Sequence, residues 1–484
     1  MYKRVNSIGI FGIDPYMVDV EADILRGFAS FDIVGLPDLA VKESKNRIQA
    51  AITNSGFIFP EVKITVNLAP ADIKKAGALY DLPILLAILF ANGQIDEGKQ
   101  DDAAFIGEVS LDGELRRING VLPMAIEAKE RGIKRLFLPI QNAAEAAAVK
   151  GIDVYGIKTV KQLVSCLEGN IKLTPTAPSA ISCKESRSRL NFSEVRGQYA
   201  AKKALEIAAA GGHNVLMIGP PGSGKSMLAK RLSTILPEMT FEESIETTKI
   251  HSVAGTVNPD SPLVTERPFR SPHHTVSVAG LSGGGAMPRP GEISMAHNGV
   301  LFLDELPEFS RQAMETLRAP LEDGKVTISR AAGRITYPCS FSLVAAMNPC
   351  PCGYYGHPKK DCICSKQTVR NYLTKISGPM LDRLDIHVEV PAIDYDELTS
   401  DYIEESSEEI RKRVNRARKI QQERYSGTGI TCNAHLTPEM VKKYCRLTSD
   451  AEKLVKISSA YPTPRDAALT SCRPRDSSRR RATP

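Results

Sequence analysis

The chain has 484 residues, of which 42% are apolar and 24% are charged, so it is long enough for about three domains with buried cores. The net charge is +6, but residues 465–484 supply +4 of it through six arginines and two aspartates, so the overall charge gives little support for nucleic-acid binding. The longest apolar run, residues 82–91, has only ten residues, whereas a membrane-spanning helix needs roughly 20. We therefore do not expect the chain to span a membrane.

The first part of the chain, residues 1–168, alternates β-like apolar runs with amphipathic helical runs, which is typical of a mixed α/β domain. Acidic residues at positions 14, 19 and 21 argue against a signal peptide, and we therefore expect a cytoplasmic protein. Residues 169–190 are rich in Ser, Pro and Thr and lack an apolar period, which predicts an interdomain linker.

A second α/β unit, residues 191–395, opens with an apolar run, a glycine-rich loop and a helical pattern, which is the context of a phosphate-binding loop. Glycines allow backbone N–H groups to close around phosphates, Lys225 can reach the β- and γ-phosphate oxygens, and Ser226 can bind Mg²⁺. This motif predicts ATP and Mg²⁺ as cofactors, and the alternative is a glycine-rich turn that matches by chance. The candidate loop residues are Gly219, Pro220, Pro221, Gly222, Ser223, Gly224, Lys225 and Ser226.

Two later apolar runs end in polar side chains that suit the same chemistry. The first run ends in Asp304 and Glu305, which could bind Mg²⁺ and activate water respectively. The second run ends in Asn348, a neutral side chain that could orient the attacking water beside the γ-phosphate. A strand that ends in Asp-Glu is weak support alone, but together with the phosphate loop it predicts an ATPase site.

The segments that precede these two apolar runs each contain a pair of basic residues that are candidates for a functional site. His273 and His274 lie in a long, glycine-rich segment, and we favour a pair of polar loop residues there over ligands or catalysts. Residues 324–338 read as two alternating strands about a turn, with Arg330 and Arg334 near its tip. These arginines could grip DNA phosphates in a salt-dependent way, and the alternative is a solvated hairpin tip.

Four cysteines are gathered directly after Asn348 in two C-x-C pairs that nine residues separate. In a long chain without an export signal, such clusters favour metal over disulfides. Four thiolates could hold a tetrahedral Zn²⁺ with no open position, which predicts a structural role, and redox pairs or simple packing are the alternatives. The candidate ligands are Cys350, Cys352, Cys362 and Cys364.

The end of the chain changes character twice. Residues 396–456 read as a small, highly charged α-helical domain, which predicts a lid or partner domain. Residues 457–484 hold four prolines and an arginine cluster, so they cannot continue these helices. An altered reading frame near Ile457 is the favoured explanation, and a natural disordered basic tail is the alternative.

Several of these stretches together resemble the ComM/YifB family, a branch of the magnesium-chelatase-like AAA+ ATPases, over roughly residues 1–450. The resemblance implies an AAA+ P-loop α/β core and a C-terminal α-helical lid. It also implies that Asn348 is the sensor 1 residue and that Arg383 is an arginine finger in a neighbouring subunit's site, within a ring that we expect to be a hexamer. Without the resemblance, an arginine between two aspartates, such as Arg383, would be expected to form an ion pair at the surface. The stretches that carry the resemblance are "NLAPADIKKAGALYDLPI", "RSPHHT", "GGGAMPRPGEISMAHNGVLFLDELPEF", "NPCPCGYYG" and "SGPMLDRLDIHVEVP".

The N-terminal domain also resembles the proteolytic domain of Lon, notably at "KKAGALYDLPI", which implies a Lon-protease-like (ribosomal S5 domain 2-like) fold. A Ser-Lys protease needs a nucleophilic hydroxyl beside a lysine base. Leu79 stands at the nucleophile position, and "NGVLPM" offers no lysine where Lon has one. We therefore expect the fold without peptidase activity, used for ring assembly or partner binding.

The leading hypothesis is an ATP-driven hexameric DNA motor or helicase that promotes branch migration during recombination of incoming DNA, as the family resemblance implies. Its partners would be single-stranded or branched DNA and further copies of itself. A magnesium-chelatase-type ATPase that remodels a protein partner is the main alternative. A third hypothesis, an assembly module that uses ATP only as a switch, is disfavoured by the intact Asp304, Glu305 and Asn348.

Overall fold

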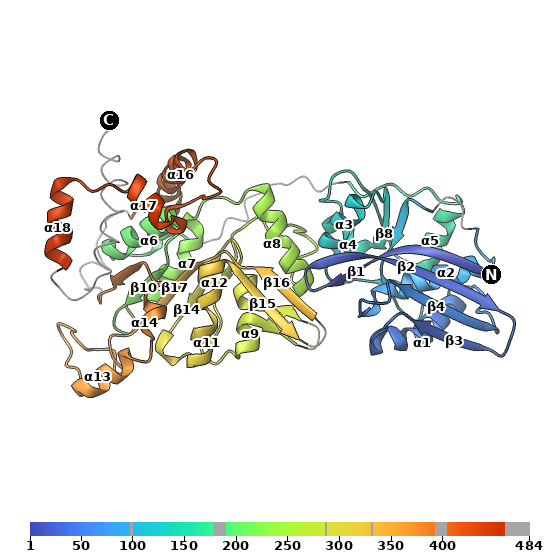
Figure 1. Ribbon diagram of the computed structural model, residues 1–484, viewed down its shortest axis with the longest axis horizontal. Helices are drawn as coiled ribbons and strands as arrows, with labels where there is room; N and C mark the ends of the chain where they lie inside the picture. Colours follow the sequence, from blue (N-terminus) through green and yellow to red (C-terminus); the bar gives the residue numbers. More distant parts are fainter. Residues whose placement is uncertain (97–99, 178–189, 286–287, 331–332, 393–403, 460–484) are drawn as a thin grey trace.

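The computed structural model of the chain describes residues 1–96, 100–177, 190–285, 288–330, 333–392 and 404–459. The part of the expected linker at 178–189 and the part of the expected tail at 460–484 lie outside these described residues. Two lobes lie side by side along the long axis, with the N-terminal half in one lobe and the chain after residue 190 in the other (Figure 1). Among the helices in the described ranges, none is long and apolar enough to cross a membrane.

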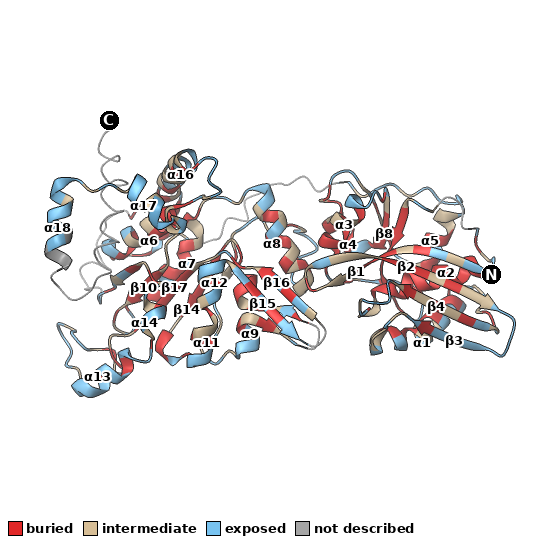
Figure 2. Ribbon diagram, in the orientation of Figure 1, coloured by how far each residue is buried: buried red, intermediate tan, exposed pale blue. Residues whose placement is uncertain are grey.

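The N-terminal lobe begins with a four-stranded sheet in the order β1-β2-β4-β3, in which β3 and β4 are parallel and the other pairs are antiparallel. Helix α2 packs against this sheet, and all of its residues are buried (Figure 2). The apolar run at 82–91 is thus a core helix, which explains its composition without a membrane. The elements are β1 (Tyr2–Phe11), β2 (Asp14–Leu25), β3 (Ser30–Val34), α1 (Leu39–Asn54), β4 (Lys63–Ala69) and α2 (Asp81–Ala91).

A second, parallel sheet in the order β5-β8-β9 completes this lobe. Strands β5 and β8 are almost wholly buried, and aromatic rings stack across them: the Phe105 and Phe137 centroids lie 5.0 Å apart. The elements are β5 (Ala103–Phe105), β6 (Glu108–Val109), β7 (Leu115–Arg116), α3 (Val121–Glu130), β8 (Arg135–Pro139), α4 (Ile140–Ala146), β9 (Asp153–Ile157) and α5 (Val160–Leu167).

The second lobe is built on a five-stranded sheet in the order β11-β14-β17-β10-β18, in which all neighbours are parallel. The central strands are continuous apolar runs because both faces of the sheet are covered. All five carboxyl ends therefore meet at one edge, where ligands of open α/β sheets bind. The strands are β10 (Val215–Ile218), β11 (Phe269–Arg270), β14 (Val300–Leu303), β17 (Ser342–Met347) and β18 (Ile386–Glu389).

Helices cover this sheet and form the C-terminal cap. Helix α16 packs on α6 and α7, and a capping box between Ser406 and Glu409 starts it. The helices are α6 (Tyr199–Gly211), α7 (Lys225–Ile235), α8 (Phe241–Ala254), α13 (Lys366–Leu373), α14 (Gly378–Leu381), α16 (Ser407–Arg424), α17 (Pro438–Tyr444) and α18 (Ser449–Ser459).

The long segment between α8 and β14, and the chain that follows β14, add small elements beside the sheet. The alternating segment at 324–338 forms an antiparallel hairpin, as the sequence predicts, with Ser329 opposite Arg334 and Arg330 opposite Gly333. These elements are α9 (Val278–Ser282), β12 (Gly283–Gly284), β13 (Arg289–Pro290), α10 (Glu292–Met295), α11 (Arg311–Thr316), α12 (Arg318–Asp323), β15 (Lys325–Arg330) and β16 (Gly333–Pro338).

The two lobes touch at the helices α3 and α8, and also where the turn between β1 and β2 meets the hairpin β15–β16 (Figure 1). A Cβ on Gly333 would lie 2.7 Å from Cζ of Phe11, and a Cβ on Gly12 would lie 2.5 Å from Cδ1 of Ile335. Glycine at both positions thus permits close packing. The mixed α/β architecture with a parallel P-loop sheet confirms the fold class that the sequence predicts.

Candidate functional site

The glycine-rich loop joins β10 to α7 at the carboxyl edge of the parallel sheet. Gly222 and Gly224 have φ values of 76° and 88°, in the left-handed region that favours glycine. Gly219 has another reason to be glycine, since a Cβ there would lie 2.0 Å from the Val390 carbonyl oxygen at the end of β18. The loop therefore turns tightly and presents the N-terminus of α7 to the space above the sheet.

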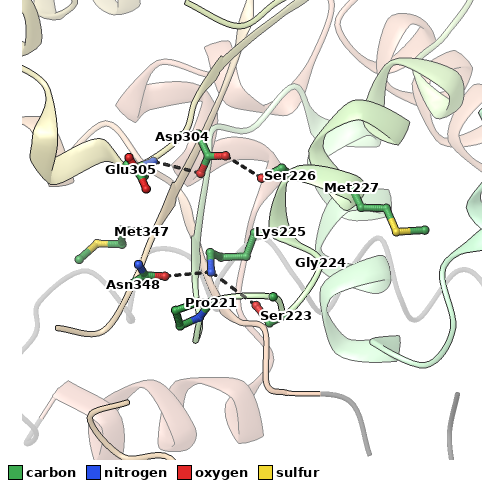
Figure 3. Close-up of a pocket in the computed structure, with 11 residues that line it drawn as sticks. Pro221, Ser223, Gly224, Lys225, Ser226, Met227, Asp304, Glu305, Met347 and Asn348 are labelled. Carbon is green, nitrogen blue, oxygen red and sulfur yellow. Dashed lines mark hydrogen bonds between the residues drawn. The ribbon is translucent and has the colours of Figure 1, made fainter. Parts of the chain in front are cut away.

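Lys225 points from the first turn of α7 back across the loop (Figure 3). Its Nζ donates to the carbonyl oxygens of Gly219 at 2.7 Å and Pro220 at 2.9 Å, and to Oδ1 of Asn348 at 3.2 Å. Burial lowers the pKa of Lys225, and the nearby charge of Asp304 opposes this shift. The ammonium group thus connects the phosphate loop to the end of β17.

Asp304 and Ser226 form the other half of the pocket (Figure 3). The Ser226 hydroxyl donates to Oδ2 of Asp304 at 2.6 Å, and the backbone N–H of Glu305 donates to Oδ1 at 3.0 Å. Glu305 itself has a φ of 52°, an uncommon conformation for a residue other than glycine, and such outliers cluster at functional sites. Hydroxyl and carboxylate oxygens that meet in this way suit a hard cation such as Mg²⁺.

These side chains line one cavity of about 410 Å³ at the carboxyl edge of the sheet. The structure thus brings together candidate residues that the sequence separates by up to 127 positions, while Gly219 and Pro220 of the loop do not line the cavity. The cavity is lined by Pro221, Gly222, Ser223, Gly224, Lys225, Ser226, Met227, Asp304, Glu305, Met347 and Asn348.

Arg383 does not line this pocket. It lies between α14 and β18, where its guanidinium pairs with Glu322 of α12 and donates to the Pro379 carbonyl oxygen at 2.8 Å. Within a single chain, Arg383 therefore forms an ion pair, as expected for an arginine whose neighbours in the sequence are charged. Its predicted role in a neighbouring subunit stays a prediction.

Arg330 and Arg334 are both exposed on the hairpin β15–β16. A Cβ on Gly284 would lie 3.3 Å from Nη2 of Arg330, so this arginine borders the short strand β12. Neither arginine lines the nucleotide pocket. The hairpin thus exposes two arginines outside the pocket.

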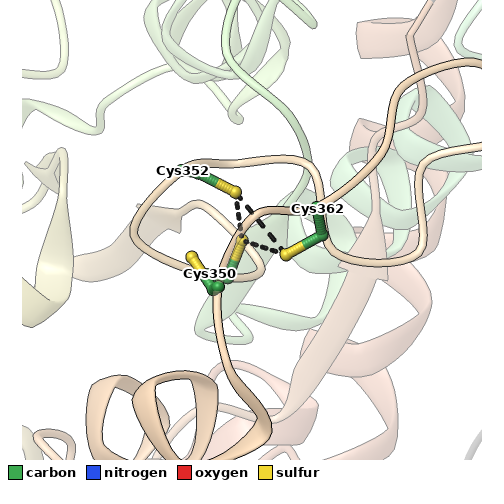
Figure 4. Close-up of side chains that lie close together, drawn as sticks. Cys350, Cys352 and Cys362 are labelled. Atoms are coloured by element: carbon green, nitrogen blue, oxygen red, sulfur yellow. Dashed lines mark hydrogen bonds between the residues drawn. The ribbon is translucent and has the colours of Figure 1, made fainter.

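The four cysteines converge, although nine residues lie between the two pairs, and Figure 4 shows Cys350, Cys352 and Cys362 facing one another. The sulfur of Cys350 lies 3.3 Å from that of Cys352 and 3.7 Å from that of Cys362, and all four sulfurs, including that of Cys364, lie within 4.8 Å of one another. Sulfurs at the corners of a tetrahedral zinc site with Zn–S of ~2.3 Å would lie about 3.8 Å apart. The donor set and its spacing therefore fit Zn²⁺.

The backbone around the cysteines also suits thiolates. The N–H of Tyr355 donates to the sulfur of Cys350 at 3.3 Å, and a backbone hydrogen bond from Tyr354 lowers the pKa of the Cys352 thiol. The cysteine loop also touches the phosphate loop, since a Cβ on Gly353 would lie 2.4 Å from Cδ of Pro221. The cluster thus abuts the nucleotide pocket on one side and follows Asn348 on the other.

One contact of the site was not predicted. Nδ1 of His274 lies 3.5 Å from Oε2 of Glu305, although the sequence favoured an ordinary polar pair for His273 and His274. His274 follows β11, and Glu305 follows β14. These two strands are parallel neighbours, so both residues lie at the same edge of the sheet. Because β11 has only two residues, no periodicity in the sequence reveals it.

Leu79 is buried in the 3-10 turn Ala78–Tyr80 that precedes α2, and a leucine carries no nucleophilic group. Lys75 precedes it and is fully buried, and burial lowers its pKa. The pair of hydroxyl and lysine that Ser-Lys hydrolysis needs is therefore incomplete at this position.

Comparison with known proteins covers nearly the whole chain. Three family models match: "Magnesium chelatase, subunit ChlI" over residues 191–398, "Subunit ChlI of Mg-chelatase" over 20–142, and "Magnesium chelatase, subunit ChlI C-terminal" over 404–461. Competence protein ComM of Haemophilus influenzae is 43% identical over 452 residues, which cover 92% of this chain and 86% of the relative. YifB of Escherichia coli is 41% identical over 449 residues, with the same shares covered. Lon protease 2 of Bacillus subtilis is 30% identical over 154 residues, 29% of this chain and 27% of that protein.

Proposed function

The chain belongs to the magnesium chelatase subunit ChlI family of AAA+ ATPases, alongside ComM and YifB, and on this premise we propose that it is an ATP-driven motor that moves on DNA as a ring. Of the features described above, the nucleotide pocket carries the proposal most directly. Five candidate residues from three segments of the chain, namely Lys225, Ser226, Asp304, Glu305 and Asn348, line that pocket.

We assign each of these side chains a role in ATP hydrolysis. The loop N–H groups and Lys225 would bind the phosphates, and Ser226 and Asp304 would hold Mg²⁺, which when bound would supply positive charge near the transferred phosphoryl group. Asn348 orients the attacking water, and Glu305 accepts its proton. Lys225 already contacts Asn348 at 3.2 Å, so the phosphate-binding and water-orienting groups are preset relative to each other.

A ring would complete this site. Arg383 lies outside its own chain's pocket, and in the proposed hexamer it would leave Glu322 to contact the nucleotide of a neighbouring subunit. An arginine supplied in this way stabilises the charge of the phosphoryl-transfer transition state. Turnover would then depend on protein concentration, because the complete site exists only in the assembly.

The DNA part of the proposal draws on the exposed arginines of the hairpin and on the relative from Haemophilus influenzae, which is named a competence protein. We propose that Arg330 and Arg334 grip phosphates, and that the motor promotes branch migration in the recombination of incoming DNA. A protein-remodelling ATPase of the magnesium chelatase type is the second candidate, since three family models carry that name.

Steady-state ATPase assays without DNA, with single-stranded DNA and with branched DNA distinguish the DNA motor from the protein-remodelling ATPase. Stimulation by DNA is the result expected of the motor. A turnover that depends on Lys225 but is indifferent to DNA would contradict the motor and favour the protein-remodelling ATPase.

Joint replacement of Arg330 and Arg334 by alanine should weaken DNA binding and DNA-stimulated turnover. Each lost phosphate contact should reduce the slope of log affinity against log salt by about 1. Fluorescence anisotropy with labelled DNA at several salt concentrations measures both effects. Arg131→Ala, an exposed arginine of the other lobe, is the matched control. Unchanged affinity and salt dependence in the double variant would exclude the hairpin as a DNA contact.

We also propose that the four cysteines hold a structural Zn²⁺. Support comes from the convergence of four sulfurs, from the short distances between them, and from backbone N–H donors around them. With all four positions taken by thiolates, the metal would stabilise the loop rather than act on a substrate.

Finally, we propose the division of the chain into a Lon-like domain at 1–168, a linker at 169–190, an ATPase core at 191–395, a lid at 396–456 and an atypical tail at 457–484. The Lon-like domain would lack peptidase activity, because Leu79 takes the place of a nucleophile. It would serve assembly or partner binding instead.

A further inference from the structure

The cysteine loop joins the end of β17 to helix α13, and its two ends come together. Asn348 follows β17 directly, and Cys350 stands two residues later. At the other end, Cys364 immediately precedes Ser365, the residue that caps α13. Because the four cysteine sulfurs lie within 4.8 Å of one another, the start of α13 returns to the end of the strand that carries Asn348.

One side chain of α13 closes the same loop a second time. Tyr372 is only 7% exposed and belongs to the core cluster that contains Met347, the last residue of β17. The backbone N–H of Asn348 donates to the phenolic oxygen of Tyr372. Burial raises the pKa of Tyr372 to about 12, and the hydrogen bond from Asn348 opposes this rise. A neutral, buried hydroxyl therefore holds the backbone of Asn348 beside the pocket.

The ring of Tyr372 is itself held in place. Nζ of Lys375, one turn further along α13, lies 5.7 Å from the centroid of the ring. The same Nζ lies 3.1 Å from Oε1 of Glu308, which ends the short turn Leu306–Glu308 after β14. Helix α13 thus contacts the chain after β14 as well as the chain after β17, and both contacts limit how far the Tyr372 hydroxyl can move.

We propose that Tyr372 is a positioning residue for ATP hydrolysis: its hydroxyl fixes the backbone of Asn348 and so directs the amide that orients the attacking water. Tyr372 does not line the pocket, so it acts through Asn348, whose Oδ1 already lies 3.2 Å from Nζ of Lys225. A small shift of a group that orients a reactant lowers the rate strongly. This inference rests on the proposed function, and it deepens that function by naming what keeps the water-orienting side chain in place.

The first test is Tyr372→Phe, which removes the hydroxyl and keeps the ring in the core. It should lower kcat about tenfold and leave the KM for ATP nearly unchanged, because the phosphate-binding groups are intact while the water is misplaced. Tyr425→Phe is the matched control, since Tyr425 is buried in the same lobe and its hydroxyl donates to Oδ1 of Asn433 at 2.8 Å, away from the pocket. The control should keep kcat within about twofold. Melting temperatures of both variants check that they are equally well folded.

Asn348→Ala, alone and combined with Tyr372→Phe, tests whether Tyr372 acts through Asn348. Asn348→Ala alone should be slow, and the added Tyr372→Phe should lower kcat by less than about twofold, because the amide that Tyr372 directs is already gone. A larger further fall would overturn the inference, and so would a normal kcat in Tyr372→Phe or an equal fall in Tyr425→Phe.

The same set of variants separates this inference from the proposed function. If Asn348→Ala turns ATP over normally, the role proposed for Asn348 is wrong and the inference falls with it. If Asn348→Ala is slow but Tyr372→Phe is normal, the proposed function stands and only the positioning by Tyr372 is wrong.

Discussion

Replacement of Lys225 by alanine should lower ATP turnover by about 100-fold or more, since loss of one preorganised charge-stabilising donor typically costs that much. Nζ of Lys225 is the cationic donor of the pocket that contacts both the phosphate loop and Asn348. Its removal takes away the ammonium that would face the β- and γ-phosphates and also frees the Asn348 side chain. The measurement is steady-state phosphate release, together with the dissociation constant of a fluorescent ATP analogue.

The matched control is Lys230→Ala, which removes an exposed lysine from the same helix α7. It should leave turnover within about twofold of the unaltered chain, because surface changes of this kind have small effects. Substantial turnover in Lys225→Ala, with the control normal, would show that the glycine-rich loop is not the hydrolytic site.

The second large effect is expected at the cysteine cluster. Cys350→Ser should reduce bound zinc from about one ion per chain to almost none, and should lower the melting temperature, because a structural zinc site contributes folding free energy directly. Cys350 is fully buried and stands two residues after Asn348. Elemental analysis and differential scanning fluorimetry give the two readings.

The same substitution should also weaken ATP binding, by about tenfold, or about 1.4 kcal/mol. The reason is that Gly353 of the cysteine loop packs on Pro221 of the phosphate loop, so a loosened cluster no longer supports the loop. Cys166→Ser, in the other lobe, is the matched control. Unaltered protein that is free of metal, with thiols that oxidise in pairs, would contradict the zinc proposal and favour redox pairs.

The phosphate loop could be predicted from the sequence because its chemistry is local: three closely spaced glycines, a lysine and a serine occupy fixed positions between a strand and a helix. The convergence of Asp304 and Asn348 on this loop could also be anticipated, since each residue ends an apolar run that reads as a parallel strand. The α/β fold class followed from the same alternation.

Other features depended on contacts that no local pattern encodes. The approach of His274 to Glu305 needs the pairing of β11 with β14, and β11 is too short to show a period. The packing of Phe11 on Gly333 joins residues more than 300 positions apart. Arg383 was identified only by family resemblance, and its ion pair with Glu322 comes from the way α12 and α14 are placed.

The contact between the β1–β2 turn and the hairpin β15–β16 has a mechanical consequence. Phe11 and Ile13 pack against the core that contains the hairpin residues Val326, Ile328 and Ile335. Full burial of an aromatic side chain is worth about 1.5–3 kcal/mol, and Phe11 is partly buried here, so separating the hairpin from the turn would cost part of that free energy. Any movement of the hairpin relative to the N-terminal lobe would therefore have to carry the β1–β2 turn along or break this contact.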